Sequence, residues 1–96
     1  MNKNEEMTLL KNVINEFGAN NQIIKSIEEL SELTTALARY FVKNEEDINN
    51  IHEEIADVQI MIDQLNMIFD SEIINHYRTM KLNRLIEEML NDDEKL

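Results

Sequence analysis

The sequence predicts an all-helical fold, and three observations support this prediction. The chain of 96 residues contains no proline and a single glycine, so the residues that most often interrupt helices are almost absent. Apolar residues recur at intervals of three and four along four consecutive segments, which is the period of a helix with one buried face. A single domain of this length, residues 1–96, leaves much apolar surface uncovered as a monomer. We therefore expect a four-helix bundle that is completed by oligomerisation.

The first predicted helix runs from Asn4 to Phe17. Its apolar residues share one face: Met7, Leu10, Val13, Ile14 and Phe17. Gly18 follows directly, at the point where a helix commonly ends in a left-handed residue. We therefore interpret the only glycine as a helix C-cap.

Two long helices are predicted next, from Asn20 to Lys43 and from Glu46 to Phe69. The predicted core stripe of the first consists of Ile23, Ile27, Leu30, Thr34, Leu37 and Phe41, and that of the second of Ile51, Ile55, Val58, Ile62, Leu65 and Phe69. The connection around Asn44 is short, and short connections join antiparallel neighbours. The two central helices should therefore pair antiparallel.

A fourth helix is predicted from Ser71, as N-cap, to about Leu90. Its apolar residues change face midway. The first face carries Ile73, Tyr77 and Met80, and the second carries Leu82, Leu85, Ile86 and Met89. This change indicates a kink in the helix or a second packing partner, such as another subunit. Residues 91–96 are expected to form a flexible acidic tail.

The formal net charge of −11 argues against a nucleic-acid-binding surface, which needs clustered lysine and arginine. It does not exclude a phosphorylated small molecule, because a bound divalent cation can make an acidic site attractive to polyphosphate.

The absence of cysteine excludes disulfides and thiol chemistry. No segment of the sequence approaches a membrane span or an uncharged signal core, and we expect a cytoplasmic protein without membrane contact.

A second row of residues flanks each predicted core stripe of the central helices, and each row carries two acids. Glu29 and Glu32 are three residues apart on the first, and Glu54 and Asp57 are three apart on its antiparallel partner. Four carboxylates would then face one another, an arrangement that needs a cation. Oxygen ligands without histidine or cysteine favour Mg²⁺, with Mn²⁺ as a substitute. The alternative is a solvated acidic face, since 20 of the 96 residues are acidic.

The paired acidic motifs resemble the signature of a known enzyme family. Glu28-Glu29-Leu30-Ser31-Glu32 is followed after 20 residues by Glu53-Glu54-Ile55-Ala56-Asp57, and the similarity continues through residues 58–65 and 81–85. This pattern is similar to that of the MazG-like all-α nucleoside triphosphate pyrophosphohydrolases, and it covers the three helices after the first.

The resemblance implies a homodimer or homotetramer that hydrolyses a nucleoside triphosphate to its monophosphate and pyrophosphate. It implies catalytic Mg²⁺ held by four acids: Glu29, Glu32, Glu54 and Asp57. A glutamate near the metal would orient the attacking water. The neighbouring Glu28 and Glu53 either support the site in this way or face solvent.

Candidate substrate-binding residues are fewer. Likeness to the family's basic stretch implies that Lys81 and Arg84 bind the phosphates of the substrate. Lys25, one turn before Glu29, is a third candidate for phosphate binding. Alternatively, each of the three is a surface cation paired with nearby acids. Gln22, with Asn21, could bind the base or cap its helix. Two apolar residues of the acid row, Met61 and Ile68, could line a pocket or serve as core. His52 and His76 are expected at the surface.

Two alternatives to this function remain open. Phosphoribosyl-ATP pyrophosphohydrolases have acids at similar spacing, but their Ala-Asp pair is followed closely by Tyr-His, whereas Val58, Gln59 and Ile60 follow Asp57 here. The second alternative is a non-catalytic helical module for oligomerisation or regulation, which could use the same bundle. Ile60 and Met67 lie away from the predicted core stripe of their helix, so they predict a second interface for an enzyme and for such a module alike. Metal binding by the four acids would distinguish an enzyme from such a module.

Overall fold

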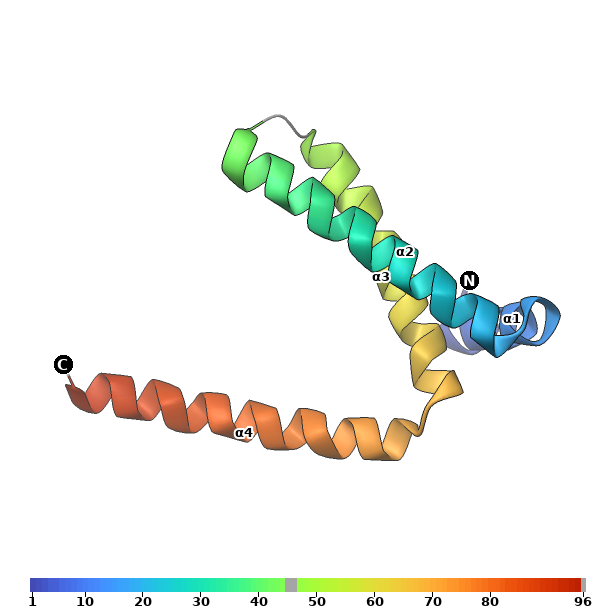
Figure 1. Cartoon of the computed structure of the whole chain (residues 1–96). Helices are drawn as coiled ribbons and strands as arrows, with labels where there is room; N and C mark the ends of the chain where they lie inside the picture. The colour runs from blue at the N-terminus through green and yellow to red at the C-terminus, as the bar shows by residue number, and fades with distance from the viewer. Residues whose placement is uncertain (45–46, 96) are drawn as a thin grey trace.

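The computed structural model describes residues 1–44 and 47–95, with side chains up to residue 92 in the last helix. Within these residues the fold is all-helical and contains no strand: α1 (Lys3–Phe17), α2 (Ala19–Ala38), a π-helical extension η1 (Arg39–Lys43), α3 (Ile48–Ile68) and α4 (Ser71–Lys95). Helices α2 and α3 form a long hairpin, α1 packs against its open end, and α4 leads away from it (Figure 1). No helix among the described residues is long and apolar enough to cross a membrane.

Helix α1 is defined at both ends by local hydrogen bonds. Asn2 and Glu5 form a capping box, in which the Asn2 side chain accepts from the Glu5 backbone N–H at 2.8 Å. The predicted apolar face is confirmed except at its end: Leu10 is buried and Met7, Val13 and Ile14 are half-buried, whereas Phe17 is 59% exposed. Gly18 ends the helix with a positive φ of 93°, as expected of a C-cap, but its ψ of 143° places it outside the left-handed helical region. This conformation lets α2 start at the next residue.

The antiparallel hairpin was predicted correctly, but the contact face of α2 was not. Its buried or half-buried positions are Gln22, Ile23, Ser26, Glu29, Leu33 and Ala36, and all of these except Ile23 form a row one residue removed from the predicted core stripe. One residue corresponds to about 100° of rotation around a helix. Small side chains explain the difference, because Ser26 and Ala36, each 2% exposed, allow α3 to approach closely.

The predicted core stripes therefore point largely away from the hairpin contact. In α2, Ile27 is 61% exposed and Phe41 87%. In α3, Ile51, Val58 and Leu65 do lie toward the contact, while the alternate members of the stripe are exposed: Ile55, Ile62 and Phe69. Apolar surface of this extent is expected where another subunit or helix packs.

The connection between the central helices is short, as predicted. Asn44 ends η1 in the left-handed conformation, with φ 55° and ψ 34°. The side chain of Asp47 caps α3 by accepting from the Asn49 backbone N–H at 2.9 Å. Glu46, where the sequence placed the start of this helix, lies outside the described residues, and α3 ends at Ile68, one residue before the predicted Phe69.

Helix α4 differs from its prediction at both ends. Asp70, rather than Ser71, is the N-cap, because the Asp70 side chain accepts from the backbone N–H groups of Glu72 and Ile73. The helix continues to Lys95 without interruption, beyond the predicted end at about Leu90. Helix propensity does not explain this extension, because Asn91, Asp92 and Asp93 are poor helix formers.

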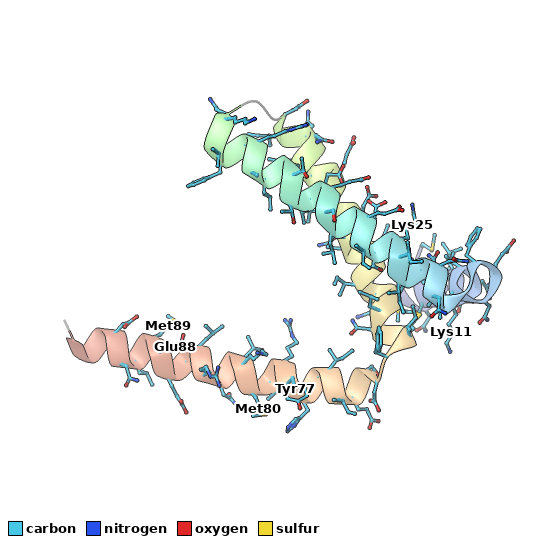
Figure 2. The ribbon with its side chains drawn as sticks, viewed as in Figure 1. Lys11, Lys25, Tyr77, Met80, Glu88 and Met89 are labelled. Carbon is cyan, nitrogen blue, oxygen red and sulfur yellow. The ribbon has the colours of Figure 1, made fainter. Side chains whose placement is uncertain are left out.

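The described side chains of α4 are all exposed, including the apolar residues on both of its faces. Helix α4 has few contacts with α3, and the molecule measures 54 × 39 × 26 Å. Figure 2 shows Met80 and Met89 along this helix with no other element beside them, whereas Tyr77 lines a hollow with Ile62 and Asn66 of α3. The change of apolar face in the sequence therefore corresponds to an unpartnered helix and not to a break within it.

Candidate metal centre and adjoining cavity

Three of the four predicted acids come together where α2 crosses α3. Carboxylate oxygens of Glu29, Glu54 and Asp57 all lie within 4.8 Å of one another. The helical period puts Glu54 and Asp57 on one side of α3, and the antiparallel pairing brings Glu29 of α2 opposite them. Oxygen atoms at this spacing can bind a single cation together.

Two of these carboxylates are partly removed from solvent. The Glu29 side chain is 13% exposed and Glu54 is half-buried, whereas Asp57 lies at the exposed edge. The Oε2 atoms of Glu29 and Glu54 are both buried and have no hydrogen-bond partner. A buried carboxylate oxygen without a partner is unfavourable, so the protein alone does not satisfy these groups.

The acids influence the ionisation of Glu54. Burial, followed by the negative charges of Glu32, Asp57 and Glu29, raises the pKa of the Glu54 carboxyl above its ordinary value of 4.5. Hydrogen bonding to the Glu32 side chain raises the pKa of Glu54 further. Glu32 is thus the fourth member of the cluster, on its exposed side.

One cation lies beside the cluster. Lys25 projects from α2 in the half of the hairpin nearer α1 (Figure 2), and its Nζ is 3.5 Å from Glu29 Oε1. The pair follows the i, i+4 spacing, as the alternative interpretation of Lys25 predicted. Because the lysine side chain is 55% exposed, it could exchange this contact for a phosphate oxygen.

The other predicted charged residues do not join the acids. Glu28 and Glu53 are exposed, which agrees with the solvent-facing alternative given for them. Lys81 and Arg84 lie on α4, where they line a separate hollow with Tyr77 and Met80. In a single chain, Lys81 and Arg84 do not line the cavity beside the acids, so their binding of a substrate phosphate stays a prediction.

Both histidines lie at the surface, as predicted. His76 packs edge-on against Tyr77, with ring centroids 5.7 Å apart. No ligand set among the described residues includes a histidine.

A cavity of about 360 Å³ adjoins the acid cluster. It lies between α1, α2 and α3 and shares Glu29, Asp57 and Lys25 with the cluster. The rest of its lining is mainly apolar and comes from all three helices: Leu10, Val13, Phe17, Ile60 and Met61, with Gln22 and Gln64. Volumes of about 300–1,000 Å³ are typical of small-molecule sites. Met61 is 4% exposed and also lines this cavity, so both alternatives given for it apply, whereas Ile68 is half-buried and lies outside the lining.

The cavity wall contains a buried pair of amides. Gln22, 6% exposed, donates from Nε2 to Oε1 of Gln64, 3% exposed, at 2.7 Å. Gln22 was a predicted base-binding residue, whereas Gln64 was assigned no role. The sequence feature that could have identified Gln64 is its position on the same row of α3 as Glu54 and Asp57. Asn21, considered with Gln22, donates instead to the carbonyl oxygen of Phe17 at 2.7 Å and so supports the α1–α2 turn.

The acid cluster fits a hard divalent cation. Its donors are carboxylate oxygens, two of them are buried without partners, and the mutual repulsion of the acids is reflected in the raised pKa of Glu54. A divalent cation would supply the missing partners and offset the repulsion. Glu29, Glu54 and Asp57 could hold it, and Glu32 is adjacent.

Comparison with known proteins adds no relative: no protein-family model matches the chain, and no curated protein or solved structure does either.

Proposed function

We propose that the chain is an Mg²⁺-dependent nucleoside triphosphate pyrophosphohydrolase. The observation that supports this most strongly is the set of three carboxylates whose oxygens lie within 4.8 Å of one another, two of them burying an unpartnered oxygen. The adjoining cavity of about 360 Å³ offers room for the nucleoside beside a metal-bound triphosphate. The motif resemblance to MazG-like enzymes, which rests on the same acids, supports the same reaction.

In this proposal water displaces pyrophosphate from the α-phosphorus, and a bound divalent cation would supply positive charge that offsets the charge of the triphosphate. Glu29, Glu54 and Asp57 would hold the cation, with Glu54 in its ionised form. Glu32, at the exposed side of the cluster, would hydrogen-bond the attacking water and receive its proton. Lys25 turns from Glu29 to a phosphate oxygen.

We further propose that the active protein is a homodimer or homotetramer. The exposed apolar residues of α2, α3 and α4 would then pack between subunits instead of facing water. Lys81 and Arg84 could reach a phosphate in such an assembly from the α4 of another subunit. The same apolar faces would also serve a non-catalytic oligomerisation module, so the reaction must be tested directly.

The decisive experiment is an incubation of the purified protein with Mg²⁺ and a panel of ribo- and deoxyribonucleoside triphosphates, including phosphoribosyl-ATP, followed by separation of the products. Asp57→Asn tests the cluster, and Asp63→Asn is its matched control because Asp63 is an exposed acid of the same helix. We expect monophosphate and pyrophosphate from the wild type and from Asp63→Asn. We expect neither product from Asp57→Asn or without Mg²⁺.

Each other result would identify an alternative. Exclusive turnover of phosphoribosyl-ATP would favour the histidine-pathway type of enzyme. Absence of turnover with every substrate would overturn the proposed activity and leave the helical interaction module as the better interpretation.

A further inference from the structure

The cavity beside the acids has a polar feature that packing alone does not require. Gln22 on α2 and Gln64 on α3 are both more than nine-tenths buried, and both line the cavity. Burying two amides costs free energy that an apolar pair of similar shape would not cost. Their position on the cavity wall therefore points to a polar group that binds there.

The hydrogen bond between the two side chains fixes which atoms remain for a ligand. Gln22 Nε2 donates to Gln64 Oε1, so Gln22 keeps its carbonyl oxygen as an acceptor and Gln64 keeps its amide hydrogens as donors. The contact of Gln64 Nε2 with the Met61 sulfur, at 3.8 Å, is a weak one that a better acceptor would replace. The pair thus offers an acceptor next to a donor.

This pattern is complementary to one edge of a nucleobase. Every base carries an N–H donor beside a carbonyl or ring-nitrogen acceptor, as uracil does at N3 and O4. The apolar lining would cover the faces of such a planar ring. Phe17, at the cavity wall and 59% exposed, supplies an aromatic surface for stacking.

We propose that the buried Gln22–Gln64 pair binds the hydrogen-bonding edge of the substrate's nucleobase, with Phe17 against the ring. This inference rests on the proposed function, and it makes the two glutamines the residues that determine recognition of the base. The arrangement also orients the nucleotide, because Glu29, Asp57 and Lys25 line the same cavity and would lie beside the triphosphate when the glutamines hold the base.

The test separates base recognition from a structural role of the pair. Gln22→Met/Gln64→Met removes both partners together, which should leave the fold intact because no buried amide is orphaned. Gln59→Met is the matched control, since Gln59 is an exposed glutamine of α3. Loss of two hydrogen bonds to the base should raise KM for the best nucleotide about tenfold, with kcat nearly unchanged. A purely structural pair would leave KM at its wild-type value.

A binding measurement keeps the inference independent of turnover. Uridine, 3-methyluridine, the other common nucleosides and ribose 5-phosphate are titrated into ¹⁵N-labelled protein, and the side-chain amide signals of Gln22 and Gln64 are followed by NMR. We expect at least one unmodified nucleoside to shift both signals, and ribose 5-phosphate to shift neither. If uridine is that nucleoside, 3-methyluridine should fail, because its N3 methyl group replaces the N3–H that would donate to Gln22 Oε1.

The outcomes distinguish failure of this inference from failure of the proposed function. Turnover with an unchanged KM in the double variant, or amide signals that no nucleoside moves, would overturn base recognition while the enzyme assignment stands. Nucleoside-induced shifts without any turnover would support base recognition and refute the hydrolase.

Discussion

Glu29 on α2 and Glu54 on α3 face each other across the helix hairpin, and each buries an Oε2 atom that has no hydrogen-bond partner. The pairing of the helices therefore brings together two acids that repel one another. Such an arrangement is unfavourable in the protein alone and favourable with a cation between the carboxylates. The following predictions depend on this relationship and on the surfaces around it.

The stability of the metal-free protein should fall as the pH rises above the ordinary glutamic acid pKa of 4.5. Burial and the neighbouring acids raise the pKa of Glu54, so the folded protein binds the proton more tightly than the unfolded chain does. This contribution is fully present below 4.5 and is lost as the pH passes the raised pKa. Thermal unfolding with a chelator between about pH 4 and about pH 7 would measure it.

Glu54→Gln should flatten this pH dependence, because the amide does not ionise. Glu53→Gln, one residue earlier and exposed, should retain the wild-type slope. Equal slopes in both variants would show that Glu54 is not the responsible group.

Lys25→Met should weaken substrate binding more than it weakens the fold. The ion pair with Glu29 involves a lysine that is 55% exposed, and such pairs contribute about 0–1 kcal/mol to stability. A lysine that binds a phosphate oxygen should affect KM severalfold. Steady-state kinetics and chemical denaturation would give the two quantities, with Lys11→Met, an exposed lysine of α1, as the control. An unchanged KM would remove Lys25 from the site.

The exposed apolar stripe of α2 should mediate subunit association. Ile27→Asp places a charge in this stripe, where Ile27 is 61% exposed in the single chain, and should shift the protein toward monomer. Thr35→Asp introduces the same charge on the same helix but off the stripe, so it should leave the assembly intact. Light scattering after size-exclusion chromatography measures the mass. A wild-type monomer would refute the predicted oligomer.

Gly18→Ala should destabilise the fold by about 1–3 kcal/mol, the usual cost of a sparsely populated backbone conformation for a residue with a side chain. The φ of Gly18 is 93°, while the nearest atom to an added Cβ, Asn21 Nδ2, is 3.8 Å away, so backbone conformation and not crowding is the cause. Urea denaturation measures the change. A variant as stable as the wild type would mean that the α1–α2 turn adapts without strain.

The order and approximate bounds of the four helices followed from the sequence, because a period of 3.6 in apolar residues identifies a helix whatever it packs against. The contact face of α2 did not. An apolar stripe shows which face avoids water, but not whether a neighbour in the same chain or another subunit covers it. Ser26 and Ala36 face α3, whereas the larger Ile27 and Phe41 do not.

The acids of the candidate site were predictable from their spacing, since residues three apart share a helix face. Their partial burial was not, because it follows from the rotated contact face. Gln64 was missed for the same reason: it was expected beside the core and lies within it, 3% exposed. Asp70 and Ser71 can both cap a helix, and only the hydrogen bonds show that Asp70 does.

The most direct test of the central claim is a calorimetric titration of the chelator-treated protein with Mg²⁺. The account predicts saturable binding to the wild type and to Asp63→Asn, with loss of binding in Glu54→Gln and Asp57→Asn. Binding to the wild type should strengthen as the pH rises, because the metal competes with the proton on Glu54. Absence of binding to the wild type, or equal binding to all four proteins, would contradict a metal centre at these acids.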